Sequence, residues 1–275
     1  QNITSTATTT AAGVGYGATG SVTLALVEVG STTKVASGAN VTASKGTYDI
    51  LAHSILTATA NAYGLSAALG GSVQAAIARL TVKPVVLASV TGGQIQAKNI
   101  RVRALFNVND NNSYNKAGNL KSNAYAGAAS GLVSGSGASS EITVDGSATA
   151  EVTNATLTLT EDALVLSKAN GSLTGNGAGL AAAGGAAVGG VVVKIENTFK
   201  TIAQITRTTI TAARNVSVLA DYDGTVNGTA KGTAGGLLAA GTAQNLEITE
   251  DITTTAEIAN STITANGAAS AVAQD

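Results

Sequence analysis

The chain contains no cysteine, methionine or tryptophan, and its 275 residues include a single proline, Pro84. Without cysteine, neither a disulfide scaffold nor a cysteine-based metal or redox site can form. One histidine, His53, cannot build a multi-histidine zinc site, and no carboxylate lies within three residues of it in the sequence. We therefore interpret His53 as an ordinary solvent-facing residue and predict no Ser-His or Cys-His chemistry.

Aromatic and charged residues are also scarce. They make up 3% and 11% of the chain, whereas about 25% of a typical soluble domain is charged. The hydrophobic fraction of 44% nevertheless excludes a disordered chain. Alanine, glycine, threonine, valine and serine dominate, so dense packing requires backbones that lie close together with small side chains between them. This composition favours stacked β-structure over a thick globular core.

The net charge of −1 and the absence of a basic stripe argue against a nucleic-acid partner. A long charge-free run, between Lys168 and Lys194, consists mostly of alanine and glycine and predicts no membrane span. The chain begins at Gln1 rather than methionine. We expect either a mature N-terminus left after signal cleavage or a slice of a longer protein.

An internal repeat is the most informative feature of the sequence. An apolar-Thr-Ala-like triplet starts at residues 41, 95, 157, 210 and 263, with spacings of 54, 62, 53 and 53 residues. The long spacing indicates an insertion loop near 107–123, which is rich in asparagine. We expect one domain, 1–275, with repeats at approximately 13–63, 64–125, 126–178, 179–231 and 232–275.

Within each repeat, apolar residues alternate with polar ones over segments of 4–7 residues, as in Val216-Ser217-Val218, and glycine follows as a corner. This pattern predicts an all-β fold, a right-handed parallel β-helix (β-solenoid) of about five repeats of ~53 residues. Each repeat forms either two narrow coils or one wide coil. Short helices over Gly64–Leu80 and Ala178–Val188 are a less favoured alternative, because glycine interrupts the alanine runs.

Both ends of the chain fall inside a repeat, and the start of the sequence resembles what the last copy lacks. An uncovered end exposes backbone donors and acceptors, so we expect copies to stack head to tail into a filament. The alternative of a slice from a longer protein stays open. The residues expected at the subunit contact are Gln1, Asn2, Ile3, Ile263, Ala265 and Asp275.

Gly179 to Ile195, followed by Ile205 to Ala220, resembles the repeats of large secreted bacterial surface proteins of the fusobacterial leukotoxin-like and autotransporter-adhesin-like families. The shared features are an Ala-Gly-rich stretch, a valine-rich strand, and an Ile-Thr-Ala triplet followed by an Asn-Val-Ser-Val-like strand. The resemblance implies an exported parallel β-helix used for attachment, surface display or toxicity. It implies no catalytic residue.

Paired carboxylates are the one pattern that points to catalysis, because glycoside cleavage uses two acids. The pairs are Glu161-Asp162, Glu250-Asp251 and Asp221-Asp223, and each is also explained by a turn. Asp221 and Asp223, with Asn227 beyond, form a fragment of a calcium loop that lacks a closing acid. We therefore predict a chain that is not an enzyme and has no cofactor, and these three residues are only weak calcium candidates.

Eight Asn-x-Ser/Thr sequons are candidate glycosylation sites in an extracellular chain. They are Asn2, Asn40, Asn111, Asn154, Asn170, Asn215, Asn227 and Asn260.

Three functions follow from the sequence. The first is an extracellular or cell-surface structural protein that self-assembles into a filament with itself as partner. The second is an adhesin-type surface rod that binds a glycan or a host protein. The third is a polysaccharide-acting β-helix enzyme.

Overall fold

The computed structural model describes residues 2–13, 17–115, 119–212 and 214–275. These residues form 19 β-strands joined by turns and short loops, and no helix occurs among them. Within the same ranges, no helix is long and apolar enough to cross a bilayer. The fold is therefore all-β.

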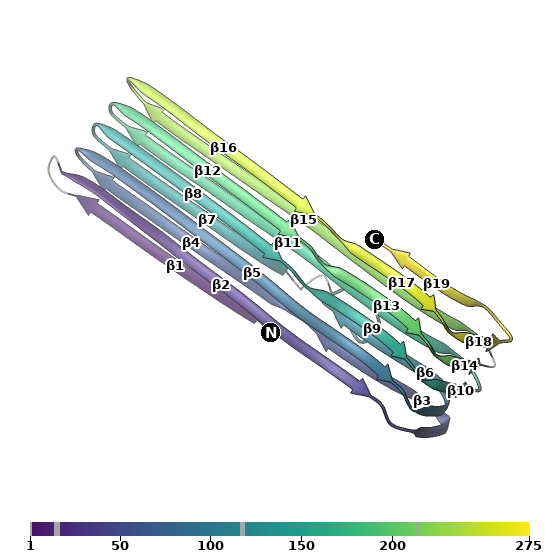
Figure 1. Ribbon diagram of the computed structural model, residues 1–275. Helices are drawn as coiled ribbons and strands as arrows, with labels where there is room; N and C mark the ends of the chain where they lie inside the picture. The colour runs from purple at the N-terminus through teal and green to yellow at the C-terminus, as the bar shows by residue number, and fades with distance from the viewer. Residues whose placement is uncertain (1, 14–16, 116–118, 213) are drawn as a thin grey trace.

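The strands form two sheets in which all neighbours pair in parallel. In Figure 1 the long strands run side by side and turn back at one end of the molecule. The 11-stranded sheet contains β1 (Asn2–Gly13), β3 (Val41–Ser54), β4 (Thr57–Ala68), β6 (Gln94–Phe106), β7 (Asn119–Ser130), β10 (Thr156–Leu159), β11 (Ala163–Ala183), β14 (Thr209–Ala212), β15 (Val216–Gly236), β18 (Thr262–Ala265) and β19 (Ala269–Gln274). The 8-stranded sheet contains β2 (Ala18–Ser37), β5 (Gly71–Thr91), β8 (Val133–Val144), β9 (Ser147–Thr153), β12 (Ala186–Asn197), β13 (Lys200–Thr206), β16 (Ala239–Glu250) and β17 (Thr253–Ala259).

The predicted right-handed parallel β-helix is wrong. We expected coils built from strands of 4–7 residues, whereas β2, β5, β11 and β15 are 20 or 21 residues long and belong to two broad sheets with open edges. The reason lies in the use of glycine, which we expected to form corners. Gly177 and Gly179 lie inside β11, where Cβ atoms would lie 2.6 Å from Val191 Cγ1 and 3.2 Å from Val191 Cγ2 of the facing sheet. Glycine is used there for close approach of two sheets rather than for turning the chain.

The spacing of the triplets appears directly in the strand register. Leu157 of β10 pairs with Ile95 of β6 on one side and with Ile210 of β14 on the other. Val41 pairs with Ile95, and Ile210 pairs with Ile263, so the five triplet positions form a single file across the 11-stranded sheet. Residues about 53 positions apart in the sequence therefore lie next to each other on neighbouring strands. A polar or apolar side chain at one position is repeated at the same position of the next strand.

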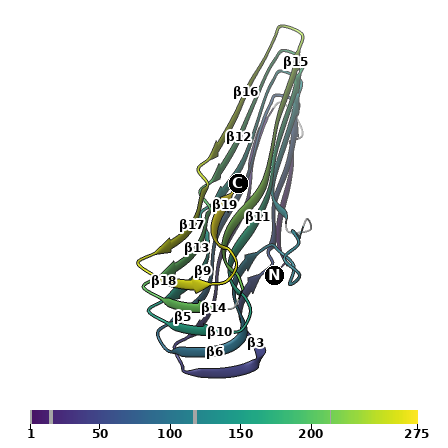
Figure 2. The same ribbon diagram turned by 90° about the vertical axis from the view of Figure 1, so that its right-hand side faces the viewer.

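The two sheets face each other with a thin interior at one end and a thicker interior at the other (Figure 2). At the thin end the buried residues are small: Ala76, Ala78, Ser122, Ala138 and Ser140. Buried serines there bond to backbone, as in Ser140 Oγ to the Ser122 carbonyl at 2.8 Å. Partway along the molecule, where β6 and β12 end, Phe106 and Phe199 stack with ring centroids 5.2 Å apart, and Tyr222 lies 5.8 Å from Phe199.

A left-handed backbone corner recurs between the strands that change sheets. Gly92, Asn154, Arg207 and Asn260 follow residues that pair with one another, and their φ angles are 73°, 55°, 50° and 51°. Glycine and asparagine tolerate this conformation, whereas arginine has no such preference. Arg207 is thus the exception in a row that otherwise uses suitable residues.

The predicted insertion loop near 107–123 is shorter in the structure. Strand β6 ends at Phe106 and β7 begins at Asn119, so residues 119–123 belong to a strand. The loop residues described, 107–115, include a buried Asn107 whose Oδ1 accepts a bond from Leu56 N at 2.8 Å.

Candidate functional site: two open sheet edges

The N-terminal edge of the molecule consists of β1, β2 and β3. Among the described strands, each of these pairs on one side only: β1 with β4, β2 with β5 and β3 with β6. The backbone groups that point away from the partner are free to pair with a further strand. Strands β1 and β2 alone offer 12 and 20 residues for such pairing.

The C-terminal edge consists of β16 to β19 and the distal part of β15. Strand β19 covers Val216 to Asp221 of β15, and Tyr222 to Gly236 pair with no described strand on that side. Every residue of β16 is exposed. Leu246 and Ile248 are 47% and 43% exposed, although their register partners Val193 and Ile195 are fully buried. Core-type side chains therefore face solvent at this edge.

The two edges present equivalent positions. Ile3 and Val226 are the two ends of one row of register partners across the sheet, with Ala58, Leu120 and Leu173 between them. Val27 connects to Ile248 through Leu80, Ile142 and Ile195. In the same way Val41 connects to Ile263. The strands β1, β2 and β3 at the N-terminal edge therefore have the register that further strands would need in order to extend the C-terminal edge.

The residues predicted to form a subunit contact lie at these edges, apart from Gln1, which is outside the described residues. Asn2 and Ile3 are in β1 at the N-terminal edge. Ile263 and Ala265 are in β18 at the C-terminal edge, and Asp275 follows β19. The contact itself stays a prediction. Ile3 lies in the same row of register partners as Val226, whereas Ile263 lies in the row of Val41.

Charge is distributed unevenly between the edges. Residues 222–275 contain one lysine against six carboxylate side chains, although the whole chain is nearly neutral at −1. The lysine is Lys231 and the carboxylates are Asp223, Glu247, Glu250, Asp251, Glu257 and Asp275. Two C-terminal edges would therefore repel each other, because like charges on adjacent strands destabilise pairing.

The loop 107–115 is held against the outer face of the 11-stranded sheet by charged groups. Arg103 bonds Asp49 with Nη2 to Oδ2 at 2.7 Å and the Asp110 carbonyl with Nη1 at 2.9 Å. His53 Nδ1 lies 2.8 Å from Asp110 Oδ1, so His53 contacts a carboxylate that is distant in sequence. Its local sequence gave no signal for this contact.

Asp221, Asp223 and Asn227 lie along one extended strand, β15. At about 3.3 Å per residue, six residue steps place Asp221 and Asn227 roughly 20 Å apart. Asp221 Oδ2 instead pairs with Lys168 Nζ at 2.7 Å, and Lys168 Nζ lies 3.9 Å from the centroid of the Tyr114 ring. Burial, together with the nearby Asp221, raises the pKa of Tyr114. These contacts fasten the loop rather than gather oxygens around one ion.

The carboxylate pair Glu161-Asp162 is held by one arginine. Glu161 and Asp162 lie at a corner, where Arg214 Nη2 contacts Glu161 Oε2 at 2.9 Å and Asp162 Oδ2 at 2.7 Å. Desolvation raises the pKa of Glu161, but bonds from Asn99 and Lys98 and the charge of Arg214 outweigh it, so the net pKa is lowered. The described residues contain no cluster of three or more His, Asp or Glu side chains suited to a metal.

The sequons differ in accessibility. Asn170 is buried, and its Nδ2 donates to the Asn115 carbonyl at 3.3 Å, so a glycan there would not fit the folded chain. The remaining seven asparagines are exposed: Asn2, Asn40, Asn111, Asn154, Asn215, Asn227 and Asn260. Glycosylation at these positions stays a prediction.

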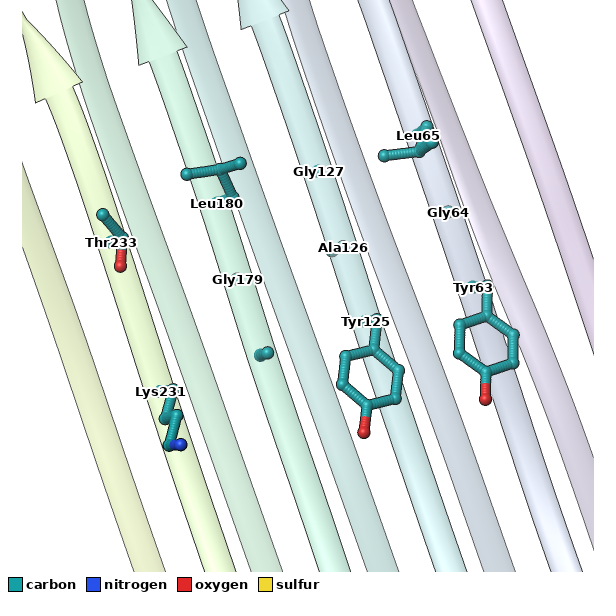
Figure 3. Close-up of a pocket in the computed structure, with 11 residues that line it drawn as sticks. Tyr63, Gly64, Leu65, Tyr125, Ala126, Gly127, Gly179, Leu180, Lys231 and Thr233 are labelled. Atoms are coloured by element: carbon teal, nitrogen blue, oxygen red, sulfur yellow. The ribbon is translucent and has the colours of Figure 1, made fainter.

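A shallow groove on the outer face of the 11-stranded sheet is lined by Tyr63, Tyr125, Leu65, Leu180 and Lys231, among others, and has a volume of about 390 Å³. The two tyrosine rings are nearly parallel, with centroids 5.2 Å apart, and Figure 3 shows them side by side. The sequence carries a signal for this pair. The triplet Asn-Ala-Tyr occurs at 61–63 and again at 123–125.

Asparagines beside the tyrosines form a ladder across the same sheet. Asn123 Nδ2 donates to Asn61 Oδ1 at 2.7 Å, and Asn176 Nδ2 donates to Asn123 Oδ1 at 2.9 Å. Repeated amides of this kind stabilise stacked parallel strands.

Comparison with known proteins finds no matching family model, no matching curated protein and no matching solved structure. The resemblance to secreted bacterial surface proteins noted from the sequence stays a prediction.

Proposed function

We propose that this chain is a non-catalytic structural element of the cell exterior that adds further copies of itself edge to edge. The observation that supports the proposal most strongly is the pair of open edges with equivalent register. A buried position at one edge corresponds to an exposed position at the other, as Val27 and Ile248 illustrate.

In the proposed contact, β1 of a second copy lies along Thr225 to Gly236 of β15, which β19 leaves free. Strand β2 of that copy lies along β16 and β17, and β3 lies along β18 and β19. Ala25 and Val27 then cover Leu246 and Ile248. Pairing continues the backbone ladder of both sheets, and each strand keeps the direction that it has within the chain.

Two physical terms favour this association. Backbone groups at both edges gain partners over strands as long as 20 residues. Covering Leu246 and Ile248 contributes about 1 kcal/mol for each side chain from apolar burial. Because the contact is heterologous and does not close on itself, addition continues and gives a rod that grows along the stacking direction.

The test is sedimentation velocity and electron microscopy of the purified chain over a wide range of concentrations. We expect association that increases with concentration, and rods that lengthen along the stacking direction of the strands. A chain that stays monomeric at every concentration while remaining folded by circular dichroism would overturn the proposal.

A matched pair of variants locates the contact. Leu246→Lys with Ile248→Lys places two cations on the inward side of the C-terminal edge and should abolish rods. Thr249→Lys with Thr253→Lys adds the same charge to the outer side of β16 and β17 and should leave rods intact. Equal effects of the two double variants would show that net charge, rather than the edge, controls assembly.

A second function, a surface rod that binds a glycan, is favoured by the Tyr63–Tyr125 groove. Both side chains keep more than a third of their surface exposed, and aromatic faces bind the apolar faces of sugars. Tyr125→Ala should then remove retention on an array of immobilised glycans, whereas Tyr125→Phe should preserve it. Unchanged binding in Tyr125→Ala would exclude this groove as the glycan site.

A further inference from the structure

The outer face of the 8-stranded sheet is apolar over most of its distal half. Outward-facing Val73 and Val188 are 60% and 62% exposed, and Val192 is 44% exposed. A shallow groove of about 430 Å³ runs across this face, lined by Ala75, Ile77, Gly137, Gly190 and others. Neither the edge-to-edge contact nor the tyrosine groove uses this surface.

Side-chain size alternates from strand to strand across the face. One row, read through the paired strands β5, β8, β12 and β16, is Val73, Gly135, Val188 and Gly241. A second row in the same strand order is Ile77, Ser139, Val192 and Asn245. In these two rows each large residue of β5 and β12 has a smaller neighbour on β8 and β16. The row between them, Ala75, Gly137, Gly190 and Ala243, is small throughout, and on its other side Ile77 pairs with Leu24 of β2.

Charge alternates in the same way at the proximal border of the face. The row is Arg79, Glu141, Lys194 and Glu247, which places positive and negative groups on successive strands. Arg79 Nε and Glu141 Oε2 are 2.7 Å apart, yet the two side chains keep 54% and 27% of their surface exposed. Lys194 also keeps 40% exposure. These groups remain available to a partner.

From this alternation we infer that two copies of the chain pair face to face through this surface, about a twofold axis parallel to the strands. Such an axis reverses the strand order, so β5 faces the partner's β16 and β8 faces the partner's β12. Val73 then meets a glycine, Val188 meets a glycine and Val192 meets a serine. Arg79 meets a glutamate, and Glu141 meets a lysine.

The alternation favours a second copy over another partner, because two rows of the face are complementary to themselves in side-chain size and the charged row is complementary to itself in sign. Reversing a row of plus, minus, plus and minus places opposite charges together at all four positions. The other twofold axis in the plane of the contact reverses the strand direction, and would therefore carry the charged row to the opposite border, away from its counterpart. Isologous contacts of this type are the commonest in homodimers.

The contact area is sufficient for a stable pair. From Gly71 to Thr81 the face extends about 35 Å along the strands, and the four strands that face the partner extend about 19 Å across them. The product is roughly 670 Å² for each copy, or about 1,300 Å² for both, which lies within the range of specific protein–protein interfaces. If copies also join edge to edge, the paired rods run in opposite stacking directions.

The test exchanges charges between two positions that face each other in the dimer. Glu141→Lys and Lys194→Glu should each weaken dimerisation about tenfold, as measured by analytical ultracentrifugation in the edge-blocked background Leu246→Lys/Ile248→Lys. The combination of both changes should restore it. Within one chain, however, the double variant places a lysine at position 141 beside Arg79 and a glutamate at position 194 beside Glu247, so like charges lie on neighbouring strands. The thermal stability of the monomer should therefore stay below that of the original chain even when dimerisation is restored. A double variant that dimerises worst of all would overturn the inference.

A second variant tests the face without disturbing the fold. A Cβ atom at Gly135 would lie 3.8 Å from Val73 Cγ2, an ordinary van der Waals distance, so Gly135→Leu should fold normally. In the dimer Gly135 lies opposite the partner's Val188, so this leucine would place two large side chains in the same space and should abolish pairing. Rods formed by the edge contact should persist as single rods in electron microscopy, which separates failure of this inference from failure of the proposed function. Unchanged dimerisation of Gly135→Leu would exclude this face as the interface.

Discussion

Ile195 and Ile248 provide a direct test of whether the C-terminal edge is open. The two residues have the same side chain and pair with each other in β12 and β16. Ile195 is fully buried and Ile248 is 43% exposed. Both face glycines of the opposite sheet: a Cβ atom at Gly175 would lie 3.1 Å from Ile195 Cδ1, and one at Gly228 would lie 3.4 Å from Ile248 Cδ1. The environments differ mainly in their neighbours within the sheet: β12 has a strand on each side of it, whereas β16 is the edge strand.

The magnitudes follow from burial. Ile195→Ala removes three buried carbons and leaves a closed cavity, so it should lower the free energy of unfolding by about 3 to 4 kcal/mol. Ile248→Ala removes the same atoms from a side chain that is nearly half in water and leaves no closed cavity. At about 0.8 kcal/mol per buried methylene, its cost should be close to 1 kcal/mol.

Equilibrium unfolding in guanidinium, followed by circular dichroism, measures both values. At concentrations where sedimentation shows monomers, the two variants should differ by about 2 kcal/mol. As copies associate, the cost of Ile248→Ala should rise toward that of Ile195→Ala, because the second copy covers the position. Equal costs in the monomer would refute the reasoning, since they would mean that Ile248 is already enclosed.

Three further predictions concern the corners and the buried phenol. Arg207→Gly should raise the free energy of unfolding by about 1 kcal/mol in thermal melts, because it removes an arginine from a left-handed conformation at φ 50°; a loss of stability would contradict this. The lowered pKa of Glu161 means that its contribution to stability is present above the ordinary value of 4.5 and is lost as pH falls through the lowered value, so Glu161→Gln should flatten the acid limb of a stability–pH profile. Desolvation raises the pKa of Tyr222 to about 12, so stability should fall as pH rises above 10, where the unfolded phenol ionises, and Tyr222→Phe should remove that decline; an unchanged alkaline limb would rule out this tyrosine as its cause.

The predicted enzyme-type features illustrate what local sequence can and cannot indicate. Asp221 and Asp223 looked like part of a loop because acidic residues next to glycine are typical of turns. In the structure they lie within β15, where Asp221 is neutralised by Lys168 from the adjacent strand. The partner lies far away along the chain, so no local pattern could have indicated it.

The sequence by itself determined the strand composition, the alternation of inward and outward residues and the register of about 53 residues, because each of these repeats along the chain and parallel pairing copies it from strand to strand. Only the tertiary structure decided the shape that these strands form. Whether Gly177 turns the chain or lets Val191 approach depends on the distance between two sheets, and that distance is set by all the small side chains between them. The open edges and the alternating rows on the outer face likewise exist only once strands distant in sequence lie side by side.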